Sequence, residues 1–135
     1  MISTKGRYAL RVMIHLAEGP STFAGIAERQ EISPAYLKVV IRILLKHQLI
    51  EQVEEEYRLT RPSEDYTAGE ILEFAEGSLS MVECLAPDAK PCHRAAECHT
   101  LPMWREFNTI VHDFFYKITL KDLMTDHCFF NNVLS

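Results

Sequence analysis

Apolar residues recur with helical spacing along the first third of the chain, and they predict a set of short helices. From Ala9 onward, apolar residues stand at i, i+3, i+4 and i+7, which places them on one face of a helix. Ser3 or Thr4 is suited to cap this helix, and Gly19-Pro20 to end it. A second, short helix is expected over Phe23–Gln30.

A third helix is predicted to have one apolar and one basic face. The dipeptide Ser33-Pro34 supplies an N-cap and a first helical residue, and the helix is expected to end near His47. Lys38, Arg42 and Lys46 stand four apart and form an exposed stripe on it. Two short helices, a tight turn and this stripe are typical of a helix-turn-helix motif. An ordinary helical hairpin with a solvated basic face would have the same pattern.

Two stretches of alternating residues follow, Ile50–Val53 and Tyr57–Leu59, and they predict two strands. The turn between them is expected to be Glu54-Glu55-Glu56. A small hairpin directly after the second helix of such a motif lies where a winged helix carries its wing. Thr67 is then expected to cap a helix over Ala68–Glu76, which Gly77 closes.

The longest helix is expected to start at Thr100 and Pro102 and to run to about Ile118, before a last short helix over Leu120–Met124. Its large apolar residues recur at alternating spacings of three and four, as in a coiled-coil seam. One interpretation is that this apolar stripe packs entirely against the rest of its own chain. We favour dimerisation, because the front module is too small to cover it. The predicted interface residues are Trp104, Phe107, Ile110, Val111, Phe114, Phe115 and Ile118.

Charge separates the two halves of this chain of 135 residues, whose net charge is −5. Residues 1–62 carry nine basic against seven acidic side chains, and residues 63–135 carry five against twelve. A mildly basic front half and an acidic back half fit a nucleic-acid reader joined to a body that does not read. No apolar run reaches the length of a membrane span and no signal peptide is apparent, so we expect a cytoplasmic protein.

A loop rich in cysteine lies between the last two predicted helices. It holds Cys84, Cys92 and Cys98 with the spacing C-x7-C-x5-C, and Cys128 is remote from it. Thiolates at this spacing can converge on one metal centre. His99 and His93 are the nearest nitrogen donors for a fourth position. From spacing alone, a structural zinc site ranks above an iron–sulfur cluster, and either ranks above thiol redox sensing. No pair of catalytic groups stands out, so the chain is not expected to be an enzyme.

Several motifs along almost the whole chain resemble the IscR/NsrR family of bacterial winged-helix regulators. They are Ser3-Thr4-Lys5-Gly6-Arg7-Tyr8-Ala9, Ile26-Ala27-Glu28-Arg29-Gln30, Ile32-Ser33, Tyr36-Leu37, Gly69-Glu70-Ile71-Leu72, the cysteine loop, Trp104 and Ile118-Thr119-Leu120-Lys121-Asp122-Leu123. The resemblance implies a homodimeric repressor or activator with an iron–sulfur cluster, 2Fe-2S or 4Fe-4S, on the three loop cysteines. The state of that cluster would set DNA affinity.

The chain departs from this family at three places. The wing tip is acidic where family members usually carry glycines and often an arginine, and carboxylates repel phosphates. Lys38-Val39 stand where relatives often have Glu-Gln, which implies a different target sequence. Leu101 stands where IscR has a histidine ligand, and Arg7 falls near the N-terminal carboxylate of NsrR-like members. Neither residue can bind iron, so the fourth ligand stays open.

Together these observations predict a mainly α-helical fold: a winged helix-turn-helix with a small β-hairpin wing, a cysteine loop and a long C-terminal dimerisation helix. The expected parts are residues 1–77 for DNA binding, 78–101 for the cluster and 102–135 for dimerisation. The expected partner is a near-palindromic double-stranded DNA. One alternative is an interaction module with an acidic wing, and another is a zinc-stabilised regulator without sensing. The residues expected at DNA are Lys5, Arg7, Arg11, Ser33, Ala35, Tyr36, Lys38, Val39, Arg42 and Lys46.

Overall fold

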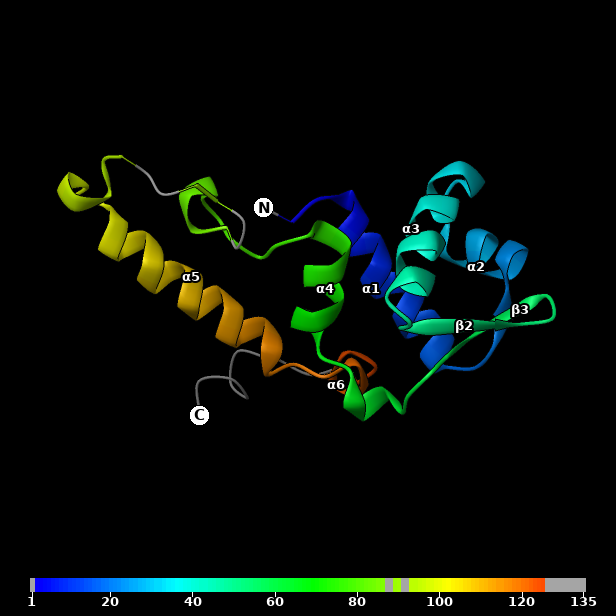
Figure 1. Ribbon diagram of the computed structural model, residues 1–135. Helices are drawn as coiled ribbons and strands as arrows, with labels where there is room; N and C mark the ends of the chain where they lie inside the picture. Colours follow the sequence, from blue (N-terminus) through cyan, green and yellow to red (C-terminus); the bar gives the residue numbers. More distant parts are fainter. Residues whose placement is uncertain (1, 87–88, 91–92, 126–135) are drawn as a thin grey trace.

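The computed structural model describes residues 2–86, 89–90 and 93–125, and the statements below concern these residues. Helices pack around a small sheet at one end of the molecule, and one long helix extends from this body as an arm (Figure 1). The helices are α1 (Thr4–Ala17), α2 (Phe23–Gln30), α3 (Pro34–Lys46), α4 (Ala68–Glu76), α5 (Leu101–Tyr116) and α6 (Leu120–Leu123); the strands are β1 (Ser21–Thr22), β2 (Ile50–Val53) and β3 (Glu56–Leu59); and the short 3₁₀ turns are η1 (Ser63–Asp65), η2 (Glu83–Leu85) and η3 (Ala95–Glu97).

Local capping residues set the helix ends. The hydroxyl of Ser33 accepts a hydrogen bond from the Tyr36 amide at 3.3 Å, and that of Thr67 accepts one from the Glu70 amide at 3.1 Å. Gly77 closes α4 in the left-handed region, with φ at 83°. The predicted bounds of α2 and α4 are confirmed, whereas α1 ends at Ala17, before the expected Gly19-Pro20.

The sheet has three antiparallel strands in the order β1-β3-β2. Strand β1 was not predicted, because two residues are too short to have a readable period. Val53 pairs with Glu56, so β3 begins one residue earlier than expected and the wing turn consists of Glu54 and Glu55. Glu54 has a φ of 58°, which is the left-handed conformation that such a two-residue turn requires.

The core lies where α1 meets α3 and α4. The predicted inner face of α1 is buried, as is that of α3. Both predicted patterns are confirmed. They could be predicted because a helix with one buried face carries apolar residues with a period of 3.6 in its sequence. The fully enclosed part also includes Tyr66, just before α4, and Leu120 at the start of α6. Residues from the second half of the chain therefore complete the core that α1 and α3 form.

The junction between α5 and α6 differs from its prediction. Helix α5 ends at Tyr116, and Ile118 lies in the connection that follows, where it is 5% exposed. The amide of Ala68 donates to the carbonyl of Ile118 at 2.8 Å, and Thr67 pairs with Thr119 in an isolated bridge. Ile118 thus belongs to the core of its own chain. Helix α5 stops before the predicted seam reaches Ile118, so we leave this residue out of the proposed interface.

Among the described residues, no helix is long and apolar enough to cross a membrane.

Candidate DNA-binding surface and cysteine loop

The outer face of α3 presents the basic stripe to solvent. Lys38, Arg42 and Lys46 are all exposed. The opposite side of the helix is buried, so these three side chains project into solvent. Six of the predicted DNA-contacting residues lie on this one helix, and a seventh, Ser33, is its N-cap. Of the uncharged ones on the helix, Ala35 and Val39 are exposed and Tyr36 is half-buried. The arrangement can accept a polyanion along α3.

The first half of α1 is held against the start of α3. The ring of Tyr8 meets the ring of Tyr36 edge to face, with centroids 5.3 Å apart. The guanidinium of Arg11 lies 5.0 Å from the Tyr8 ring and donates to the backbone carbonyl of Gln30. At least one of the hydrogen-bond donors of Arg11 is therefore used within its own chain and not available to DNA. Arg7 is exposed, and its guanidinium donates a hydrogen bond to the hydroxyl of the neighbouring Thr4 at 3.3 Å.

The wing tip is acidic in space as well as in sequence. Glu54, Glu55 and Glu56 are exposed, and Val53 beside them is 43% exposed. Across the hairpin, Arg58 and Glu51 form an ion pair at 2.5 Å, with both side chains about half exposed to water. Such surface pairs contribute little to stability. The tip therefore carries uncompensated negative charge in the described structure.

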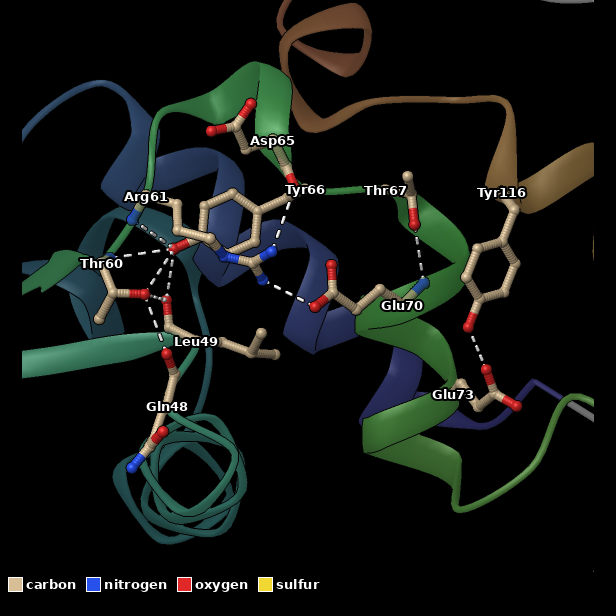
Figure 2. A network of polar contacts seen from close by, with 10 residues as sticks. All are labelled: Gln48, Leu49, Thr60, Arg61, Asp65, Tyr66, Thr67, Glu70, Glu73 and Tyr116. Carbon is tan, nitrogen blue, oxygen red and sulfur yellow. Dashed lines mark hydrogen bonds and ion pairs between the residues drawn. The ribbon is translucent and has the colours of Figure 1, made fainter.

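A network of polar contacts closes the base of the wing, and sequence analysis missed it (Figure 2). The phenol of Tyr66 donates to the carbonyl of Leu49 at 2.7 Å and accepts from the amides of Thr60 and Arg61, each at 3.0 Å. The guanidinium of Arg61 donates a hydrogen bond to the carboxylate of Glu70 on α4 at 2.7 Å. No local pattern marks Tyr66, because its partners become neighbours only in the folded chain.

The cysteine loop is pinned to α5 near its start. Asn108 on α5 accepts from the Met81 amide at 3.0 Å and donates to the Ser80 hydroxyl at 3.3 Å. That hydroxyl donates in turn to the carbonyl of Leu85 at 2.9 Å. This clamp holds the segment that leads into Cys84. Nothing in the sequence pattern singled out Asn108.

Two of the three proposed cysteine ligands lie in described parts of the chain. Cys84 is exposed and Cys98 is half-buried. The hydroxyl of Thr100 is 3.4 Å from the Cys98 sulfur, and hydrogen bonds from Thr100 lower the pKa of that thiol, which favours the thiolate that metals bind. Cys92 and Cys128 lie outside the described residues.

The donor chemistry fits a thiolate-held centre, and the described residues alone do not assemble one. Within those residues, no three His, Cys, Asp or Glu side chains come together. Cys84 lies in η2, and Cys98 directly follows η3. His93 and His99 are exposed, whereas Leu101 is 8% exposed and has no donor atom.

The arm carries large apolar side chains in water. Phe107, Ile110 and Phe114 on α5 are 40%, 59% and 36% exposed. Met103 is 53% exposed on the same side, although sequence analysis had not included it. Trp104, Val111 and Phe115 are half-buried. A cavity of about 270 Å³ beside them is lined by Ile2, Met81, Ile110, Val111, Phe114 and Phe115. A continuous apolar face of this kind marks an interaction surface.

Comparison with known proteins places these features in a family context. A family model, "Rrf2: Iron-dependent Transcriptional regulator", matches residues 2–126. The HTH-type transcriptional regulator IscR of Sodalis glossinidius is 30% identical, over 93% of this chain and 79% of its own length. The structure of CymR (YrzC), the global cysteine regulator of B. subtilis, aligns with a TM-score of 0.73 at 33% identity and covers 94% of this chain and 98% of its own. IscR of T. potens gives 0.69 at 28% identity, with 93% and 87% covered.

Proposed function

The chain belongs to the Rrf2 family of transcriptional regulators, and from this premise we propose that it is a homodimer whose affinity for DNA depends on an iron–sulfur cluster. Its relatives are regulators of transcription and not enzymes. In the proposal, residues 1–77 read DNA, residues 78–101 carry the signal and residues 102–135 dimerise. We place the protein in the cytoplasm, where its DNA is and where thiols stay reduced.

The exposed stripe on α3 is the observation that carries the DNA-binding proposal. Lys38, Arg42 and Lys46 form one row on a helix whose other side is locked in the core. A helix held in this way presents the same side chains to every partner, as a recognition helix in the major groove must. Ser33, Ala35, Tyr36 and Val39 extend the reading face, and Lys5, Arg7 and Arg11 flank it on α1.

The apolar side of α5 supports the dimer. Ile110 and Phe107 are exposed in the monomer, and a second copy of the arm would remove both from water. A two-fold pair of arms would place two copies of α3 on one side of the dimer. The DNA target would then have two related half-sites about one helical turn apart, which makes it a near-palindrome.

Cys84, Cys92 and Cys98 are the residues proposed to hold the cluster, with His99 or His93 as a possible fourth ligand. The description of the family as iron-dependent and the IscR-named relatives support this choice. Bound there, an iron–sulfur centre would supply a redox-active group whose potential depends on its ligands and its exposure to water. Residues of this chain would do the rest: Thr100 favours the Cys98 thiolate, and Asn108 holds the approach to Cys84. The proposed signal is cluster supply, redox state or nitric oxide.

Two observations favour alternatives. Identity to CymR, described as a global cysteine regulator, is 33%, against 28% to T. potens IscR. A regulator of the same build without a cluster, stabilised by zinc or responsive to another signal, therefore stands second. The exposed tip at Glu54-Glu55-Glu56 favours an interaction module that meets a basic protein surface.

One preparation separates these functions. Protein purified without oxygen is examined by ultraviolet–visible spectroscopy and metal analysis, and its binding to its own promoter region is measured at low salt. Charge-transfer bands, bound iron and DNA affinity together are the expected result. Colourless protein with stoichiometric zinc would replace the cluster by a structural metal. Absence of DNA binding in both the apo and the loaded forms would favour the interaction module.

A further inference from the structure

Tyr66 lies between the base of the wing and the chain that follows the α5 arm, and it is hydrogen-bonded to both. We propose that Tyr66 is a positioning residue through which the arm sets the placement of the wing. The proposal extends to DNA affinity only in so far as the proposed function holds. Its structural part concerns the free protein.

The side chain of Tyr66 joins both strands of the wing at their base. Its hydroxyl donates to the carbonyl of Leu49, the residue before β2, at 2.7 Å. The same oxygen accepts from the amides of Thr60 and Arg61, the two residues after β3, at 3.0 Å each. The hydroxyl of Thr60 reaches the Gln48 carbonyl at 2.9 Å (Figure 2). One phenol therefore fixes the separation between the chain entering the hairpin and the chain leaving it.

The backbone of the same residue holds the chain that returns from the arm. The carbonyl of Tyr66 accepts from the amide of Leu120, the first residue of α6, at 3.0 Å. The bridge between Thr67 and Thr119 and the bond from the Ala68 amide to the Ile118 carbonyl continue this contact. Tyr66 is 0% exposed, so water cannot substitute for either set of bonds.

Helix α4 adds a second connection between the same two parts. Glu70 binds the guanidinium of Arg61, which lies 4.2 Å from the centre of the Tyr66 ring. Glu73, one turn further along α4, accepts the phenolic hydrogen bond of Tyr116 at the end of α5. Figure 2 shows the two contacts on either side of α4. A shift of the arm therefore displaces groups that are in direct contact with the wing base.

Sequential removal of two hydroxyls tests the connection in the free protein. Tyr66→Phe keeps the ring and deletes the shared oxygen, and Tyr116→Phe does the same at the arm. Amide hydrogen exchange of Thr60 and Arg61 is the readout. We expect Tyr66→Phe to speed exchange at both amides about tenfold, because each donor loses a buried partner. Tyr57→Phe, in the same hairpin, is the matched control, since its hydroxyl has no hydrogen bond within the described residues.

The double variant decides whether the arm acts through Tyr66. Tyr116→Phe alone should speed exchange at Thr60 by about threefold, and it should have no further effect in the Tyr66→Phe background. Additive effects would mean that the arm reaches the wing by another route and would overturn the proposal. An unchanged Thr60 amide in Tyr116→Phe would overturn it equally. If Tyr66→Phe does not unfold cooperatively, Arg61→Met, which removes the contact with Glu70, takes its place, with the same non-additivity expected at the Thr60 amide.

Affinity for the promoter region completes the test. Tyr66→Phe should bind DNA about tenfold more weakly than the wild type while remaining dimeric. Wild-type affinity in the variant would overturn the positioning role at DNA. If the wild type itself does not bind, the proposed function fails, and the exchange experiment still decides whether Tyr66 connects arm and wing.

Discussion

Tyr116, the last residue of α5, donates its phenolic hydrogen bond to the carboxylate of Glu73 on α4. The ring lies against Gly69, where an added Cβ would clash with it, so only glycine lets α5 approach α4 this closely. The ring of His112 stacks on the Tyr116 ring, with centroids 4.3 Å apart. Burial raises the pKa of Tyr116 well above its usual value, and the bond to Glu73 raises that pKa further.

The raised pKa of Tyr116 predicts a loss of stability in alkali. The protonated phenol is favoured in the folded protein, so its contribution is fully present below the unfolded pKa of about 10 and decreases as the pH rises above it. Tyr116→Phe should cost about 1 kcal/mol in the free energy of unfolding at pH 8. Urea titrations between pH 8 and 11 should show this difference shrinking above pH 10. A constant difference across that range would contradict the assigned bond, and Tyr57→Phe is the control.

Glu76 caps α1 from a distant part of the chain, which gives a second prediction. Its carboxylate accepts from the amides of Ser3 and Gly6, at 2.8 and 2.9 Å, and from the Ser3 hydroxyl. Negative charge at a helix N-terminus is favoured by the helix dipole. Glu76→Ala should lower the free energy of unfolding by about 1–2 kcal/mol, and Glu76→Gln by less, since one oxygen remains. Glu28→Ala, exposed on α2, should be nearly neutral in the same urea titrations.

The helices of the front module were predictable because their signals are local. A cap such as Ser33 or Thr67 bonds an amide three residues away, and Gly77 relieves strain in its own backbone. The alternation of buried and exposed positions along α3 follows the same logic. These features are legible within a window of a few residues, so the bounds of α2 and α4 came out as expected.

The parts that were missed depend on chain segments meeting across long separations. Tyr66 and Leu49 are 17 residues apart, and Tyr116 and Glu73 are 43 apart. Ile118 continued the apolar spacing of α5, yet the helix ends before it and the residue turns into the core. The convergence of cysteines is the same kind of question, because loop spacing permits a metal centre without specifying where each sulfur lies.

Dimerisation through the arm is tested by a charge on its apolar side. Ile110→Asp and Phe107→Asp replace exposed residues, so each should leave the monomer folded and abolish the dimer, since a buried unpaired carboxylate costs several kcal/mol. Sedimentation at micromolar concentration measures the change. Thr109→Asp adds the same charge on the opposite side of α5 and should stay dimeric. A wild type that sediments as a monomer at this concentration would end the dimer proposal.

The cluster ligands are tested by colour. Protein prepared without oxygen should be brown, and replacing Cys84, Cys92 or Cys98 with Ala should bleach it, because each removal leaves the centre short of a thiolate. Cys128→Ala should keep the absorption, which makes it the matched control. Retention of full colour in Cys84→Ala or Cys98→Ala would remove that residue from the ligand set.

The DNA interface is tested by the response of affinity to salt. Each phosphate contact that Lys or Arg makes releases counterions, so losing one should reduce the slope of log affinity against log salt by roughly one per bound half-site. We expect Arg42→Ala to weaken binding in this way for every sequence. Lys38→Ala should also change base preference, because Lys38 lies nearer the N-terminus of α3, the end that contacts base edges in such motifs.

Glu55→Lys reverses the charge of the wing tip and should tighten binding without regard to sequence if the tip passes near phosphates. Fluorescence anisotropy over a range of salt concentrations, with specific and scrambled duplexes, measures all three. Unchanged affinity in Glu55→Lys would place the wing away from DNA, and an unchanged slope in Arg42→Ala would remove α3 from the phosphate contacts.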